Sequence, residues 1–171
     1  MSSQCKCRIC SLSVEGASAI QTACETHYVN QGEALIKEDQ HQSKIFFLCE
    51  GEFVIQKELK MDHHQQVEIA RLEEGSMVGE MEFLTSEAPT ATVLAGKNCK
   101  VHVLEGDAFQ EILNQGNKAA LEIFFLIARI LAHRLKKMDE KVVEILSKGE
   151  AQKPMEEFAQ FRKKLLQEWD F

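Results

Sequence analysis

Short apolar runs separated by turn residues dominate the chain from Thr26 to Leu104. The runs are rich in β-branched and aromatic residues, and glycine or clusters of polar residues lie between them. Regular short strands of this kind predict an antiparallel barrel or jelly roll. The expected strands are THYV (26–29), ALI (34–36), KIFFLCE (44–50), EFVIQKEL (52–59), VEIARLE (67–73), TATVLA (90–95) and KVHVL (100–104).

The spacing of apolar residues becomes helical after Asp107. A short helix is expected from Asp107 to Leu113, and Asn117 can cap a long helix that runs through 118–147 without Gly or Pro. Apolar residues recur along this helix at spacings of four and three, which is typical of paired helices. We therefore expect a homodimer; the alternative is that the helix packs only on its own barrel. The expected dimer seam consists of Phe124, Ala128, Leu131, Leu135, Met138, Val142 and Ile145.

These patterns predict a mainly β fold with flanking helices. A double-stranded β-helix, or jelly-roll-like β-roll, is followed by the long dimerisation helix and then by a short amphipathic helix at 154–170. Pro154 suits the first position of that final helix. Residues 1–13 are expected to form a cysteine-containing tail, and residues 14–147 to form one domain that includes the long helix.

Composition narrows the classes of function. The 171 residues carry a net charge of -7, and no basic face of the kind that binds DNA is visible. No apolar run is long enough to span a membrane, and no secretory signal is recognisable at the N-terminus, so we expect a cytoplasmic protein with reduced cysteines. No Ser–His–Asp or paired-carboxylate arrangement stands apart from surface charge, so we do not expect an enzyme.

Several segments, in order and spacing, resemble the cyclic-nucleotide-binding domain of the Crp–Fnr superfamily. The resemblance covers about residues 14–145 and implies a regulatory β-roll that binds a cyclic nucleotide. The segments are GEALIKEDQ (32–40), KIFFLCEGEFVI (44–55), GSMVGEMEFL (75–84), TATVLA (90–95) and VHVLEGDAFQEIL (101–113).

The resemblance also implies a set of nucleotide-binding residues. In the family, backbone N–H groups after a glycine hold the cyclic phosphate, and the next Glu accepts a hydrogen bond from the ribose hydroxyl. Gly79 and Glu80 match these positions, and residues of the long helix would cover the purine base. The candidate nucleotide-binding residues are Gly79, Glu80, Met81, Thr90, Ala91, Met138 and Asp139.

One feature of the family pattern is missing from this segment. The Arg that pairs with the phosphate falls at Pro89 or, in a register shifted by one, at Thr90. Leaving a desolvated phosphate without its cation costs about 3–5 kcal/mol. We therefore expect binding of cyclic AMP or cyclic GMP to be weak or lost, with Glu82 adding unfavourable charge and Lys97 the only candidate substitute.

The N-terminal cysteines offer a second kind of chemistry. Thiolates spaced C-x-C-x-x-C can ligate zinc or an iron–sulfur cluster. The oxygen-sensing branch of the superfamily carries such a cluster at the N-terminus with one more ligand from a strand, which here points to Cys99 and His102. The alternative is a redox-active or incidental tail, and Cys24 and Cys49 are expected in the core. The candidate ligands are Cys5, Cys7, Cys10, Cys99 and His102.

Three functions follow from these observations. The first is a regulatory sensor module that acts as a homodimer through a protein partner, with weak or lost nucleotide binding. The second is a degenerate fold used for protein interaction or assembly, with the final helix as a docking face. The third is a redox, metal or iron–sulfur sensor. The segment after Ser147 is too short for a helix-turn-helix domain, so direct DNA binding is not expected.

Overall fold

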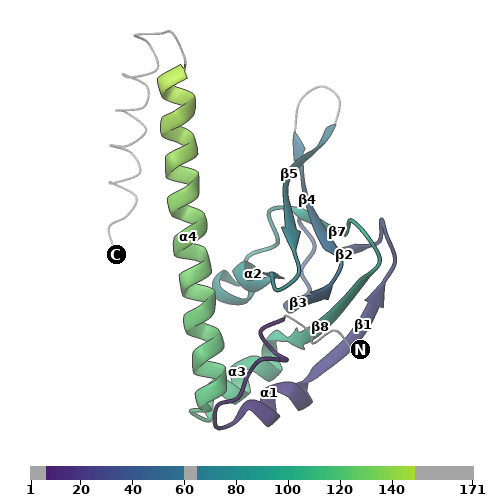
Figure 1. The fold of residues 1–171 in the computed structure, drawn as a ribbon, viewed down its shortest axis with the longest axis vertical. Coiled ribbons are helices and arrows are strands. Elements are labelled where there is room, and N and C mark those ends of the chain that lie inside the picture. The colour runs from purple at the N-terminus through teal and green to yellow at the C-terminus, as the bar shows by residue number, and fades with distance from the viewer. Residues whose placement is uncertain (1–6, 60–64, 149–171) are drawn as a thin grey trace. The chain divides into compact units, whose positions relative to one another are not determined.

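A computed structural model describes residues 7–59 and 65–148 (Figure 1). The chain divides into two compact units, Met1–Phe124 and Phe125–Phe171. The expected final helix at 154–170 lies outside the described residues, as does Cys5. Among the described residues, no helix is both long and apolar enough to cross a membrane.

The described residues of the first unit form eight strands in two antiparallel sheets (Figure 1). One sheet has the order β1 (Cys24–Val29), β8 (Cys99–Glu105), β3 (Lys44–Glu50) and β6 (Met77–Val78). The other has the order β2 (Ala34–Ile36), β7 (Thr92–Ala95), β4 (Glu52–Leu59) and β5 (Gln65–Glu73). The predicted mainly β fold with flanking helices is thereby confirmed.

The core between the sheets follows from the alternation of side chains along each strand. Phe53 of β4, with Phe46 and Leu48 of β3, meets Val101 and Val103 of β8 in one apolar cluster. Side chains at the intervening positions of β3 and β8 point to the opposite face of their sheet. That outer face carries the residues of the second candidate site.

Three helices flank the roll in the described part of the first unit. Ile20 of α1 (Ala17–Ala23) and Phe109 of α3 (Gly106–Asn114) are fully buried, and α1 contacts both α3 and β1. The third helix, α2 (Glu80–Thr85), contacts β3, and its Phe83 ring lies 5.0 Å from that of Phe109.

Asn117 begins the long helix α4, Lys118–Lys148, as predicted. Its Oδ1 accepts hydrogen bonds from the backbone N–H groups of Ala119 and Ala120, at 2.9 and 3.1 Å. Its Nδ2 donates to the carbonyl of Gly16, which ties the start of α4 to the segment before α1. The cap therefore explains both where α4 begins and what holds that end in place.

Candidate functional site

Gly79 begins the Gly79–Thr92 segment, which the resemblance assigns to phosphate binding. It has a φ of 91°, in the left-handed region, and directly precedes the six-residue helix α2. A Cβ atom at this position would collide with the carbonyl oxygen of Lys44 on β3. The close approach of α2 to β3 therefore requires glycine here even without a ligand.

The two residues after Gly79 have opposite environments. Glu80 is only 1% exposed, whereas Met81 is 50% exposed. A buried carboxylate is costly unless the surrounding protein satisfies it, and Glu80 makes an interaction within the protein. The position expected to meet a ribose hydroxyl thus holds a buried carboxylate.

Pro89 and Thr90 stand where the family pattern has its phosphate-binding Arg. Each uses its backbone carbonyl within the protein. That of Pro89 accepts from the N–H of Asp39 at 2.9 Å, and that of Thr90 accepts from Nζ of Lys57 at 2.6 Å. Ala91, next in the chain, is partly buried. Hydrogen bonds therefore attach this end of the segment to the loop before β3 and to β4. Neither Pro89 nor Thr90 carries a positive charge.

Lys57 brings a positive charge to this region that the sequence analysis missed. It follows Phe53 and Ile55 at two-residue intervals along β4, on the face that contributes to the core. Its ammonium lies 3.6 Å from Oε1 of Glu38, so its charge is already paired. Lys97, the candidate from the sequence, instead lies 4.0 Å from a carboxylate oxygen of Glu52. Linear spacing gave no signal for Lys57, because it precedes Thr90 by 33 residues.

Glu82 has a different role from the one expected. Its Oε1 accepts hydrogen bonds from the backbone N–H groups of Gln42 and Ser43, at 2.8 and 3.0 Å. Nδ1 of His41 lies 3.3 Å from the same oxygen. The side chain is 4% exposed and holds the 41–43 loop against α2. Its charge is thus used in packing this loop.

The expected purine-covering residues lie in the second unit, on α4. Met138 is 64% exposed, and Asp139 is also exposed. Among the expected seam residues of this unit, Leu135 is 49% and Val142 38% exposed. In the first unit, Phe124 is 40% exposed. The described part of α4 thus presents apolar side chains at heptad spacing to solvent.

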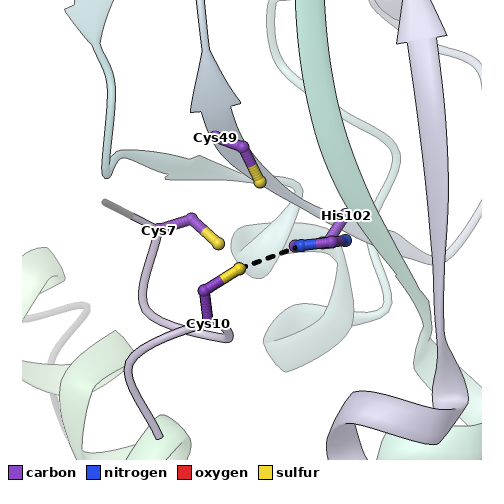
Figure 2. A group of neighbouring side chains, drawn as sticks. All are labelled: Cys7, Cys10, Cys49 and His102. Atoms are coloured by element: carbon purple, nitrogen blue, oxygen red, sulfur yellow. Dashed lines mark hydrogen bonds between the residues drawn. The ribbon is translucent and has the colours of Figure 1, made fainter. Parts of the chain in front are cut away.

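A second site assembles from three separate parts of the chain (Figure 2). Cys7 and Cys10 lie on the N-terminal turn, Cys49 on β3 and His102 on β8. The three sulfurs and one ring nitrogen all lie within 4.8 Å of one another. We call these four residues the Cys–His cluster. Cys7 and Cys49 are buried, His102 is partly buried and Cys10 is exposed.

The registers of β3 and β8 explain why Cys49 and His102 meet. His102 pairs with Phe47 of β3, and the register shifts between Leu48 and Glu50. Cys49 is therefore the extra residue of a β-bulge, a feature that re-aims side chains. Figure 2 shows its sulfur directed toward the His102 ring.

The N-terminal turn is packed in place by its own contacts. Ile9 is 2% exposed, and its carbonyl accepts a hydrogen bond from Nε2 of Gln21 on α1 at 3.2 Å. The hydroxyl of Ser11 donates to the carbonyl of Arg8 at 3.0 Å. These contacts hold Cys7 and Cys10 over the outer face of the β1–β8–β3–β6 sheet.

Both nitrogens of His102 have partners. Nε2 lies 3.2 Å from Sγ of Cys10, and Nδ1 lies 3.1 Å from Oγ1 of Thr26, its partner in the β1–β8 register. Burial, and to a lesser extent the charge of Lys100, lowers the pKa of His102. In the neutral tautomer in which Nδ1–H donates to Thr26, Nε2 presents its lone pair to the sulfurs.

Cys24 is a nearby thiol with a different character. Burial, with a smaller contribution from the charge of Cys7, raises the pKa of Cys24 to about 12. A thiol with so high a pKa stays protonated at neutral pH, and only a thiolate is a good metal ligand. Cys24 is therefore an uncharged thiol near the cluster.

The structure separates the candidate ligands expected from the sequence. Cys7, Cys10 and His102 come together, whereas the thiol of Cys99 donates to the carbonyls of Glu52 and Lys97, at 3.2 and 3.1 Å. Cys49, expected only as a core residue, takes part in the cluster. The alternation of side chains along β3 does not predict which way the Cys49 side chain points, because the bulge is not visible in the sequence.

Comparison with known proteins finds the family described as cyclic nucleotide-binding domain, which matches residues 26–116. Comparison with curated protein sequences gives no significant match. A cyclic nucleotide-binding domain from Methylobacillus flagellatus KT is 17% identical, with a TM-score of 0.70 over 78% of this chain and 74% of that one.

Two further solved structures share the fold. Catabolite activator protein from Thermus thermophilus is 18% identical, with a TM-score of 0.64 over 80% of this chain. The present chain spans 61% of that protein. The regulatory subunit of a cAMP-independent protein kinase A from Trypanosoma brucei is also 18% identical, with a TM-score of 0.53 over 64% of this chain and 38% of that one.

Proposed function

Since the chain belongs to the cyclic nucleotide-binding domain family, we propose that it is a regulatory domain whose affinity for cyclic AMP and cyclic GMP is weak or lost. The observation that carries this proposal is the absence of Arg at Pro89 and Thr90, together with the pairing of the nearby Lys57 ammonium by Glu38 and the Thr90 carbonyl. A charge-assisted contact to phosphate contributes about 1.5–3 kcal/mol.

The two halves of the segment contribute unequally to this proposal. The left-handed backbone of Gly79 and the burial of Glu80 support the part of the proposal in which the segment keeps a cradle for ribose and phosphate. Recruiting Lys57 for a phosphate would first require breaking its contacts with Glu38 and with the Thr90 carbonyl. A ligand would therefore meet the backbone cradle, but Pro89 and Thr90 offer no cation, and the nearby Lys57 is already paired.

The regulatory subunit from T. brucei belongs to a protein kinase A that is cAMP-independent. Loss of cyclic AMP control is therefore compatible with this fold in another protein. For the present chain, this supports only the idea that a protein can keep the β-roll after losing its response to a cyclic nucleotide.

The signal would pass through a homodimer and a protein partner. The supporting observation is the exposure of Leu135, Met138 and Val142 at heptad spacing on α4. A mass of about twice the 19.4 kDa of one chain, measured by light scattering, is the expected result. A monomer at micromolar concentration would contradict the dimer without affecting the proposal on nucleotide affinity.

Isothermal titration calorimetry with cyclic AMP and cyclic GMP tests the nucleotide proposal. We expect no saturable binding below about 1 mM, where the free energy of binding is about -4 kcal/mol. A dissociation constant in the micromolar range would contradict it. In that case a Lys57→Met variant, which removes the nearby cation, would show whether Lys57 replaces the missing Arg.

A further inference from the structure

The spacing of the Cys–His cluster points to a single metal ion. A tetrahedral ion with metal–sulfur bonds near 2.3 Å and a metal–nitrogen bond near 2.0 Å separates its ligand atoms by about 3.5–3.8 Å. The four ligand atoms lie within 4.8 Å of one another, and the Cys10–His102 pair lies at 3.2 Å. An iron–sulfur cluster interposes its own iron and sulfide atoms between the cysteine sulfurs, so it needs ligands that are further apart.

The donor set selects the kind of ion. Three thiolates and one imidazole form the Cys₃His set that is typical of structural zinc, and the two-residue separation of Cys7 and Cys10 is the usual spacing within such sites. Hard ions such as magnesium and calcium prefer oxygen ligands and would not be selected here. Four protein ligands also complete a tetrahedron, which leaves no open position for a substrate.

The surroundings of the cluster fit a metal-binding role. Metal-bound His almost always donates its other ring N–H to a protein oxygen, and Nδ1 of His102 lies 3.1 Å from the Thr26 hydroxyl. The Thr26 contact thus positions the ring.

From this geometry we infer that Cys7, Cys10, Cys49 and Nε2 of His102 bind one Zn²⁺ in a closed tetrahedral site. The ion fastens the N-terminal turn to the outer face of the β1–β8–β3–β6 sheet. The site shares no residue with the Gly79–Thr92 segment, so this inference does not depend on whether a nucleotide binds.

Zinc content of the full chain tests the site directly. Protein produced with zinc in the medium and purified without chelators is analysed by mass spectrometry of its metals. We expect about one zinc per chain in the wild type and a loss of at least 10-fold in Cys49→Ser, since one of four ligands is removed. The matched control is Cys99→Ser, another buried cysteine, whose sulfur lies outside the cluster and whose zinc content we expect to remain at the wild-type level.

Cobalt substitution covers the case in which Cys49→Ser does not fold. Co²⁺ bound by three thiolates in a tetrahedron gives strong sulfur-to-metal charge-transfer absorption and intense visible bands. A His102→Cys variant keeps four ligands, so we expect it to retain one metal per chain and to shift the visible bands to longer wavelength. The control His27→Cys places the same change at an exposed histidine of β1 and should leave the spectrum unchanged.

Three results would overturn the inference. The first is wild-type protein with less than about one tenth of an equivalent of zinc and no thiolate–cobalt absorption on titration under reducing conditions. The second is zinc content that persists in a folded Cys49→Ser protein. The third is iron with acid-labile sulfide in anaerobically purified protein, which would assign a cluster in place of a single ion.

Discussion

The Gly79–Thr92 segment and the Cys–His cluster lie in the same unit but are built in opposite ways. The segment is continuous in sequence and keeps the family's glycine and glutamate, yet Thr90 supplies only a carbonyl to a lysine that is already paired. The cluster is scattered over β3, β8 and the N-terminal turn, yet all four of its ligand atoms converge. A recognisable sequence motif can therefore be retained because its residues are needed for packing. A complete set of metal ligands, in contrast, can form from residues that no local sequence motif brings together.

The largest expected effect tests whether Gly79 is required for packing. Gly79→Ala should lower the free energy of unfolding by about 3 kcal/mol or more, because a left-handed backbone with a Cβ costs about 1–2 kcal/mol and the collision with the Lys44 carbonyl adds to it. Denaturant unfolding monitored by circular dichroism measures this loss.

Gly32→Ala is the matched control for that substitution. Gly32 has a similar φ of 85°, but nothing lies within 4 Å of the position of its Cβ. Its loss should stay at the roughly 1–2 kcal/mol that the left-handed backbone alone costs. Equal losses at the two positions would show that the close approach of α2 to Lys44 is not the reason for glycine at position 79. The conclusion that this part of the motif is retained for packing would then lose its support.

An intermediate effect is expected from restoring the missing cation. Thr90→Arg should tighten binding of cyclic AMP by about 10- to 100-fold, which corresponds to the roughly 1.5–3 kcal/mol of a charge-assisted contact to phosphate. Pro89→Arg tests the alternative register. Calorimetry provides the measurement, and Gln66→Arg, an exposed position on β5, controls for the change in overall charge. No gain at either position would mean that the backbone cradle has been lost along with the Arg.

The smallest effect concerns the residue that orients His102. Thr26→Val removes the hydroxyl 3.1 Å from Nδ1 and should weaken zinc binding by about 10-fold, as is usual for such outer partners. Competition with a chromophoric chelator measures the change. Thr26→Ser keeps the hydroxyl and should restore most of the affinity. Unchanged zinc affinity in Thr26→Val would show that the Thr26 hydroxyl is not needed to orient the His102 ring.

The fold could be predicted from the sequence because the signals that determine it act between residues that are close together in the chain. Alternating apolar runs, Gly51 and Gly75 at turns between strands of different sheets, with φ of 104° and 90°, and Asn117 at the start of α4 all act within a few residues. Lys57 near Thr90 and Cys49 near His102 depend instead on strand register. The bulge at Leu48–Glu50 decides where the Cys49 sulfur points, and no spacing rule reveals it.

The wide sequence separation of the zinc ligands has a consequence for folding. Cys10 and His102 are 92 residues apart, so bringing them together at one ion closes a loop over most of the roll. Closing a loop of about 100 residues removes chain entropy equivalent to about 4–5 kcal/mol. His102 lies on β8, the last strand of the roll, so the full ligand set exists only after β8 has joined β1 and β3. The N-terminal turn is thus the part of the roll that is fixed in place last.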